Sequence, residues 1–259
     1  MKPLKLAFAA LLAVFSAHAA AVGGLADVSL YDRSDGRQLP VYWHEGRAYV
    51  VGKPGNEYAV RVRNRQRDDV LGVISVDGVN VITGETAVAQ QSGYVLAPHR
   101  QFDISGWRKN LASTAAFYFT SLPDSYAART GRPDNVGVIG VALYRRKEEP
   151  APVAQPAPFA SGQLSRKEAS SAAGASAEAQ NAPRAAERED RLGTGHGRIE
   201  TSHTRHVGFE RATNDPAETV TIYYDSYRNL LARGIIPQTV LPRRPAPNPF
   251  PGFVGDPPA

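Results

Sequence analysis

The chain has 259 residues, of which 30 are Lys or Arg and 25 are Asp or Glu, so its formal net charge is +5. It contains no cysteine, which excludes disulfide bonds and thiolate metal sites. The positive excess is small and does not by itself indicate nucleic acid, whose binding proteins usually show a concentrated basic face.

The first residues, 1–19, predict a signal peptide. Lys2 and Lys5 supply the positive start, residues 6–16 form an apolar run, and residues 17–19 (AHA) form a small-x-small cleavage site. A membrane-spanning helix needs about 20 apolar residues, and neither this run nor a later one reaches that length. We therefore expect an exported protein, periplasmic or extracellular, that does not span the membrane. Loss of the two lysines lowers the net charge of the mature chain to 28 − 25 = +3.

Residues 25–147 predict a β-sandwich domain. Short apolar or alternating runs are separated by Gly, Pro, Asn and Asp, which is typical of all-β sandwiches and barrels. The expected strands cover residues 26–31, 38–42, 47–51, 57–64, 70–76, 79–82, 94–96, 101–104, 115–120 and 136–144. The fold class expected is all-β, an antiparallel sandwich of the Ig-like or jelly-roll-like type.

An Asp-Gly pair within VISVDGVNVITG invites two interpretations, a metal loop or a turn. Asp-Gly between two β-type runs is a strong signal of a two-residue hairpin turn, which needs positive φ at both positions. A calcium loop needs several oxygen ligands, whereas only Asp77 and Asn80 carry side-chain oxygens here. We expect a structural turn.

The composition changes at residue 148. Residues 148–190 are rich in Ala, Pro, Ser and charge, with few large apolar side chains, and this composition predicts a disordered linker. Residues 191–242 predict a β-hairpin of strands 199–209 and 218–224, then a short helix capped by Asp225 or Ser226 and ended by Gly234. These elements are too few to fold alone, so we expect them to dock on the sandwich. The Pro-rich residues 243–259 predict a disordered tail.

The stretch LGTGHG raises two further possibilities. Its alternating glycines, at 193, 195 and 197, lack the preceding strand of a phosphate loop and are interpreted as a flexible turn. The sequence predicts no metal site. The histidines that would form one are His196, His203 and His206, but in a β context positions i and i+3 face opposite sides.

Several segments together resemble a group of exported β-rich bacterial proteins to which no activity is assigned. The segments are YAVRVRNRQRDDVLGVISVDGVNVITG, GYVLAPHRQFDISGWRKN, FYFTSLPDSYAARTG and NVGVIGVALYRR, together with LGTGHGRIE and FERATNDP. The resemblance implies the β-rich fold and export, and it implies no catalytic residue.

Two sets of residues are the candidate binding sites. Arg61, Arg63, Arg65 and Arg67 occupy alternate positions, so on one strand they would share a face and contact an anionic polymer. The alternative is an ordinary solvated strand face. Trp107 and Arg108, with Tyr118, Phe119 and Tyr126, suggest an aromatic cluster, either core packing or a platform for sugars.

We expect a non-enzymatic binding or structural module of the bacterial envelope, with no cofactor. Its expected partner is an anionic envelope polymer such as lipopolysaccharide, or another envelope protein. The alternative is a secreted hydrolase whose site is assembled from dispersed Asp, Glu and His, for instance Asp103 or Glu85 with a histidine.

Overall fold

A computed structural model describes residues 21–148 and 191–237. The predicted signal peptide, nearly all of the predicted linker and the predicted tail lie outside the described residues. None of the described helices is both long and apolar enough to cross a membrane.

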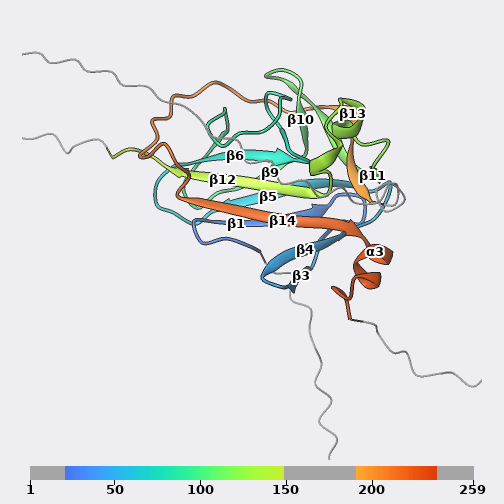
Figure 1. The fold of residues 1–259 in the computed structure, drawn as a ribbon. Helices are drawn as coiled ribbons and strands as arrows, with labels where there is room; N and C mark the ends of the chain where they lie inside the picture. Colours follow the sequence, from blue (N-terminus) through green and yellow to red (C-terminus); the bar gives the residue numbers. More distant parts are fainter. Residues whose placement is uncertain (1–20, 149–190, 238–259) are drawn as a thin grey trace, which may run out of the picture.

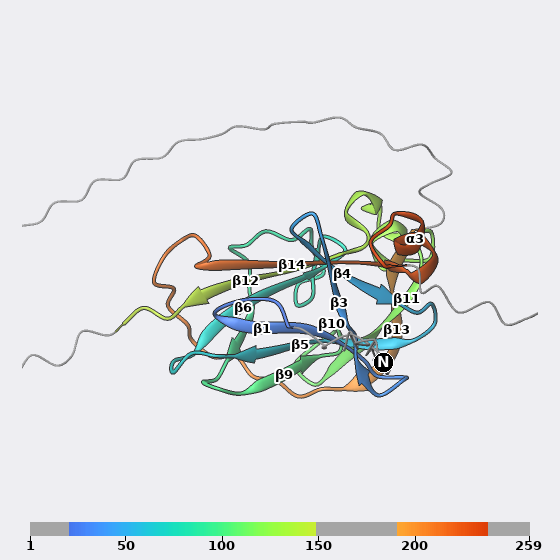
Figure 2. The ribbon, with the colours of Figure 1, turned by 90° about the horizontal axis from the view of Figure 1, so that it is seen from below.

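The fold is all-β and consists of two sheets packed against each other (Figures 1 and 2). Sheet A contains β1 (Ala26–Asp32), β2 (Arg37–Gln38), β5 (Glu57–Asn64), β9 (Gln101–Ile104), β10 (Gly106–Arg108), β11 (Ser113–Ser121) and β13 (Leu192–Thr201). Sheet B contains β3 (Val41–His44), β4 (Arg47–Gly52), β6 (Val70–Val76), β7 (Val79–Asn80), β8 (Tyr94–Leu96), β12 (Val138–Arg145) and β14 (Glu218–Ser226). The helices within the described residues are short: α1 (Tyr126–Arg129), the 3-10 helix η1 (Pro133–Asn135) and α3 (Tyr227–Ala232).

The main core lies between the sheets because alternate residues of each strand point inward. Sheet A contributes Tyr58 and Phe117, and sheet B contributes Ile139 and Ile222, all at most 1% exposed. Aromatic packing is dense at one end, where the Tyr58 and Phe119 rings stack with centroids 4.2 Å apart. The predicted sandwich is confirmed, except that β14 and β4 pair in parallel, so sheet B is mixed.

The Asp-Gly turn between β6 and β7 is confirmed. Asp77 has φ 53° and Gly78 has φ 73°, the positive values that this hairpin turn needs. Val76 pairs with Val79 across the turn. The turn is structural, although the Asp77 side chain points into the protein and does more than shape the backbone.

The C-terminal segment docks on the sandwich, as expected, but its two strands do not form a hairpin with each other. β13 pairs with β11 in sheet A, whereas β14 lies between β12 and β4 in sheet B. The segment therefore completes both sheets. The strand expected over 199–209 is also wrong, because β13 begins at Leu192 and ends at Thr201, and residues 202–210 are irregular.

The glycines of LGTGHG lie inside β13, so their interpretation as a flexible turn is wrong. A Cβ on Gly195 would lie 2.2 Å from Cζ of Tyr118, and one on Gly193 would lie 2.6 Å from Cβ of Ser125. Both distances are far below van der Waals contact. These glycines let the β13 backbone approach its neighbours, and a side chain would push the strand away.

The irregular residues after β13 cross the outer face of sheet B before the chain enters β14 (Figure 1). Phe209 packs there against a small second core of Leu71, Val73, Ala142 and Tyr144. The guanidinium of Arg211 lies 4.3 Å from the Tyr144 ring centroid and donates to the Gln91 carbonyl. Because both faces of sheet B are covered here, β6 and β12 have nearly continuous apolar sequences.

One further strand differs from the expectation, and the C-terminal helix agrees with it. The strand expected over 38–42 is two strands, β2 in sheet A and β3 in sheet B, so the chain changes sheets at Pro40. The predicted C-terminal helix is confirmed as α3. Ser226 caps it by accepting from the Asn229 amide, and Gly234 ends it with φ 71°.

Candidate functional site

The four predicted arginines do not form one row. β5 ends at Asn64, so only Arg61 and Arg63 share its outer face. Arg61 is bound within the protein, because its Nε and Nη2 donate to the two oxygens of Asp103 at 2.9 and 2.8 Å and its guanidinium covers the Tyr31 ring. Asp103 raises the pKa of Arg61. Arg65 lies beyond the strand, 3.4 Å from Asp27.

A different set of arginines remains exposed and unpaired. Arg63, Arg67 and Arg100 have no side-chain hydrogen bond or ion pair to any residue within 21–148 and 191–237. Arg63 and Arg100 are neighbours, because Arg63 pairs with Gln101 across β5 and β9 and the Asn64 amide donates to the Arg100 carbonyl. The turn that carries Arg67 folds back on the same place, since the side-chain amide of Asn64 donates to the Asp68 carbonyl at 2.8 Å. Arg145 lies beside them and donates to the neutral Gln66 amide at 3.2 Å. We call these four residues the arginine end.

Carboxylates are also present in this region, but two of them are already paired. Asp27 contacts Arg65, and Asp69 contacts Arg146 at 2.8 Å. Asp68 is exposed in the same turn as Arg67 and opposes the binding of an anion there. The four guanidinium groups of the arginine end still outnumber this one carboxylate.

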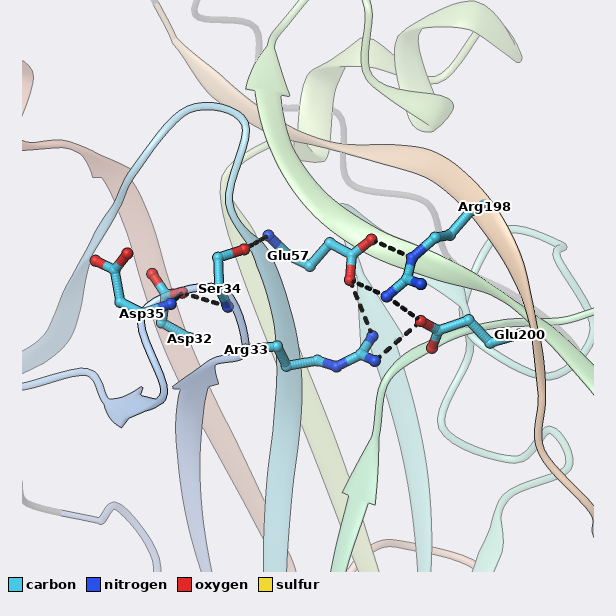
Figure 3. A network of polar contacts seen from close by, with 7 residues as sticks. All are labelled: Asp32, Arg33, Ser34, Asp35, Glu57, Arg198 and Glu200. Carbon is cyan, nitrogen blue, oxygen red and sulfur yellow. Dashed lines mark hydrogen bonds and ion pairs between the residues drawn. The ribbon is translucent and has the colours of Figure 1, made fainter.

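A charged network lies at the other end of sheet A (Figure 3). Glu57 on β5 accepts from Arg198 through a bidentate contact at 2.7 and 2.8 Å, and Glu200 on β13 accepts from Arg33 at 2.9 Å. Two further ion pairs close the network, Arg33 with Glu57 at 3.5 Å and Arg198 with Glu200 at 2.8 Å. Arg198 lowers the pKa of Glu57 chiefly through this hydrogen bonding. These contacts join β13 to β5 and to Arg33. Because the two positive and two negative charges cancel, the network offers no net charge to a ligand.

Arg108 fastens the chain that follows β13. Its Nη1 and Nη2 donate to the carbonyl and hydroxyl of Ser202 at 2.5 and 3.1 Å, and its Nε donates to the Tyr94 hydroxyl at 3.2 Å. Most N–H donors of the guanidinium are therefore already hydrogen-bonded within the protein. It lies at the edge of a cleft of about 240 Å³ between β8, β9, β10 and residues 202–204.

This cleft brings together Asp103 and His203, groups that a hydrolase would need. Both oxygens of Asp103 are already engaged by Arg61. Glu85, the other predicted acid, lies near Gln91, with Oε2 3.4 Å from its amide nitrogen. Among residues 21–148 and 191–237, neither carboxylate forms a hydrogen bond or an ion pair with a histidine.

Trp107 is buried, with 3% of its surface exposed, and packs edge-on against Phe117 at 5.1 Å. Its other neighbour is Tyr126, whose ring centroid lies 4.9 Å away. Tyr126 in turn contacts the His196 ring at 5.7 Å with an interplanar angle of 32°. Trp107 is thus part of the packing, and Tyr126 and His196 are the rings at the surface.

These two rings line a hollow of about 350 Å³ between α1 and β13, which we call the α1 hollow. Its other lining residues are Asp124, Arg129 and Thr130. Burial lowers the pKa of His196, and the positive charges of Lys109 and Arg129 lower it further. His196 is therefore neutral near pH 7, with one ring nitrogen able to donate and the other to accept.

The three candidate histidines do not converge. His196 lies on β13, His203 lines the cleft and His206 is exposed on the irregular segment. Among residues 21–148 and 191–237 no group of three or more His, Cys, Asp or Glu is arranged to hold a metal ion.

A buried network of hydrogen bonds joins the two sheets, and it includes Thr194 on β13, the strand that carries His196. Oδ1 of Asp77 accepts from the Tyr224 hydroxyl at 2.5 Å and the Gly137 amide at 2.9 Å, and its Oδ2 accepts from the Thr194 amide at 2.8 Å. Because Tyr224 gives its hydrogen to Asp77, Thr194 donates to Tyr224 and Tyr58 donates to Thr194, both at 2.6 Å. Burial raises the pKa of Asp77 to about 6.

Comparison with known proteins gives no match: no family model, no curated protein and no solved structure corresponds to this chain. The candidate sites therefore depend on their geometry alone. The sequence analysis missed Arg100, Arg145, Asp124 and Arg129, because the residues that lie beside them in the candidate sites come from distant segments. The one local signal for the α1 hollow was a histidine between two glycines at His196.

Proposed function

We propose that the protein is exported and acts as a non-enzymatic binding module that holds an anionic polymer of the bacterial envelope at the arginine end. The N-terminal sequence supports export, and the two-sheet fold supplies a rigid scaffold. One observation carries the choice of surface. Arg63, Arg67 and Arg100 are exposed without a carboxylate partner, while neighbouring arginines are paired.

The physical argument concerns the cost of binding. An arginine already held by a carboxylate must give up that partner before it contacts an anion, whereas an unpaired guanidinium offers its donors directly. Exposed charges are screened over about 8–10 Å at ordinary ionic strength, so this binding weakens with added salt. A repeating polymer compensates for weak single contacts because several sites bind at once.

The test is retention on immobilised lipopolysaccharide at low and moderate salt. The variant Arg63→Gln/Arg67→Gln/Arg100→Gln should elute earlier than the wild type and depend less on salt. The control Arg37→Gln/Arg47→Gln/Arg228→Gln removes the same charge from β2, β4 and α3 and should behave like the wild type. Equal retention of all three proteins contradicts the proposal, and equal loss in both variants shows that net charge alone is responsible.

Export has its own measurement. Cleavage after Ala19 leaves a chain that begins at Ala20, which the intact mass of the protein from a periplasmic extract or culture medium reveals. A full-length chain confined to the cytoplasm contradicts this part of the proposal.

A further inference from the structure

The α1 hollow lies at the end of the sandwich opposite the arginine end. β5 begins beside it, where Tyr58 pairs with Phe117, and runs to Arg63 at the other end. Phe117 also pairs with His196 of the hollow. Its volume of about 350 Å³ is within the range of small-ligand sites.

The wall of the hollow is held rigidly by packing behind it. Tyr126 rests on Trp107, which is fixed against Phe117. On the other side, Gly193 and Gly195 allow β13 to approach Ser125 and Tyr118, and this close approach sets His196 beside Tyr126. Ser125 itself is buried and caps α1 by accepting from the Ala128 amide. The two rings are therefore preorganised, which lowers the entropic cost of binding a ligand.

The polar groups of the hollow are incompletely used by the protein. Oδ2 of Asp124 accepts from the Ser121 hydroxyl at 2.8 Å, which leaves its other oxygen available. The Arg129 guanidinium has no hydrogen bond or ion pair to another described residue. With neutral His196, the rim thus combines an acceptor, a donor and a group that does both.

We infer that the α1 hollow binds a neutral hexose ring of a glycan, with Tyr126 and His196 against the ring and Asp124 and Arg129 on its hydroxyls. A sugar ring has an apolar C–H face and a polar edge, which matches ring side chains beside a carboxylate and a guanidinium. Among the lining residues, the charge of Asp124 offsets that of Arg129, so this rim does not favour a phosphate or a sugar acid over a neutral ring. This site goes beyond the proposed function and does not depend on it.

The probes are maltopentaose, cellopentaose and chitopentaose, each titrated to about 10 mM, a range that detects a Kd near 1 mM. Saturation-transfer and chemical-shift NMR measure binding and locate it. We expect at least one probe to bind and to shift the Tyr126 and His196 resonances. His196→Ala should weaken it about three- to tenfold through loss of the ring contact, and Asp124→Asn about tenfold through loss of a charged acceptor. Both side chains are exposed, so neither variant should unfold.

The triple variant Arg63→Gln/Arg67→Gln/Arg100→Gln serves as the control and should bind the glycan as the wild type does. Conversely, Asp124→Asn should keep the retention on lipopolysaccharide, so failure of one proposal is distinguishable from failure of the other. The inference is overturned if none of the three probes binds, if binding is unchanged in both hollow variants, or if polygalacturonate binds at the hollow in their place.

Discussion

β13 and β14 are close in the chain, yet the sandwich holds them in different ways. β14 lies between β12 and β4 in sheet B, and its Ile222 and Tyr224 are buried in the main core. β13 pairs only with β11 among the described strands, and it is held by glycine packing and by the charged network of Arg198. Apolar burial fixes the central strand, whereas close backbone approach and polar contacts fix the edge strand.

The largest expected effect comes from removing the central strand. A chain ending at Ala217 lacks β14 and α3, which exposes the core faces of β12 and β4 and leaves their backbone groups unpaired. We expect no cooperative thermal unfolding of this chain by circular dichroism. A control chain ending at Pro237 keeps every described element and should melt like the full protein. A cooperative transition at an unchanged temperature in the shorter chain would contradict the central role of β14.

Replacing one isoleucine on each strand tests the difference between β14 and β13. Ile222→Ala on β14 should lower the free energy of unfolding by about 2–5 kcal/mol, because the side chain is fully buried and its loss leaves a cavity. Ile199→Ala on β13 should change it by less than about 0.5 kcal/mol, since that side chain is 60% exposed. Urea denaturation measures both values. Similar losses at the two positions would mean that the strands are held in the same way.

Asp77 joins the two strands, because it accepts from the Thr194 amide on β13 and from Tyr224 on β14. Its folded pKa of about 6 is above the ordinary 3.8 because burial disfavours the charge. The folded state therefore holds this proton more tightly, so the contribution of Asp77 to stability is fully present below about pH 4 and is lost as the pH rises through about 6. The loss expected from this group is about 3 kcal/mol.

Urea denaturation of the wild type and of Asp77→Asn between pH 4 and pH 7 tests this dependence. The asparagine does not ionise, so the variant should lose the part of the pH slope that Asp77 causes, even if it is less stable throughout. An unchanged slope in the variant would show that another group is responsible.

The same contrast explains what the sequence could and could not predict. Alternation in Val220, Ile222 and Tyr224 predicts β14, and Ser226 with Gly234 predicts the ends of α3, because these signals are local. The start of β13 was missed because its glycines are typical of turns. Gly195 is needed there because the Tyr118 ring leaves no room for a side chain, and Tyr118 lies on another strand. The candidate sites were predicted only in part for a related reason. Cross-strand pairing decides that Asp103 binds Arg61, and packing decides that His196 meets Tyr126.

The smallest expected effect concerns the charged network that helps to hold β13. Arg198 lowers the pKa of Glu57 from its ordinary 4.5, so this group adds stability above that value and loses it as the pH falls through the lower folded pKa. Glu57→Gln should lower the Tm by about 1–3 °C at pH 7, because exposed ion pairs contribute little. The difference should shrink as the pH falls from 7 to below 4.5, opposite in sign to the Asp77 effect. Glu45→Gln, whose side chain is 81% exposed, is the control and should leave the Tm unchanged. A Glu57→Gln difference that persists unchanged in acid would show that the side chain acts through packing instead of charge.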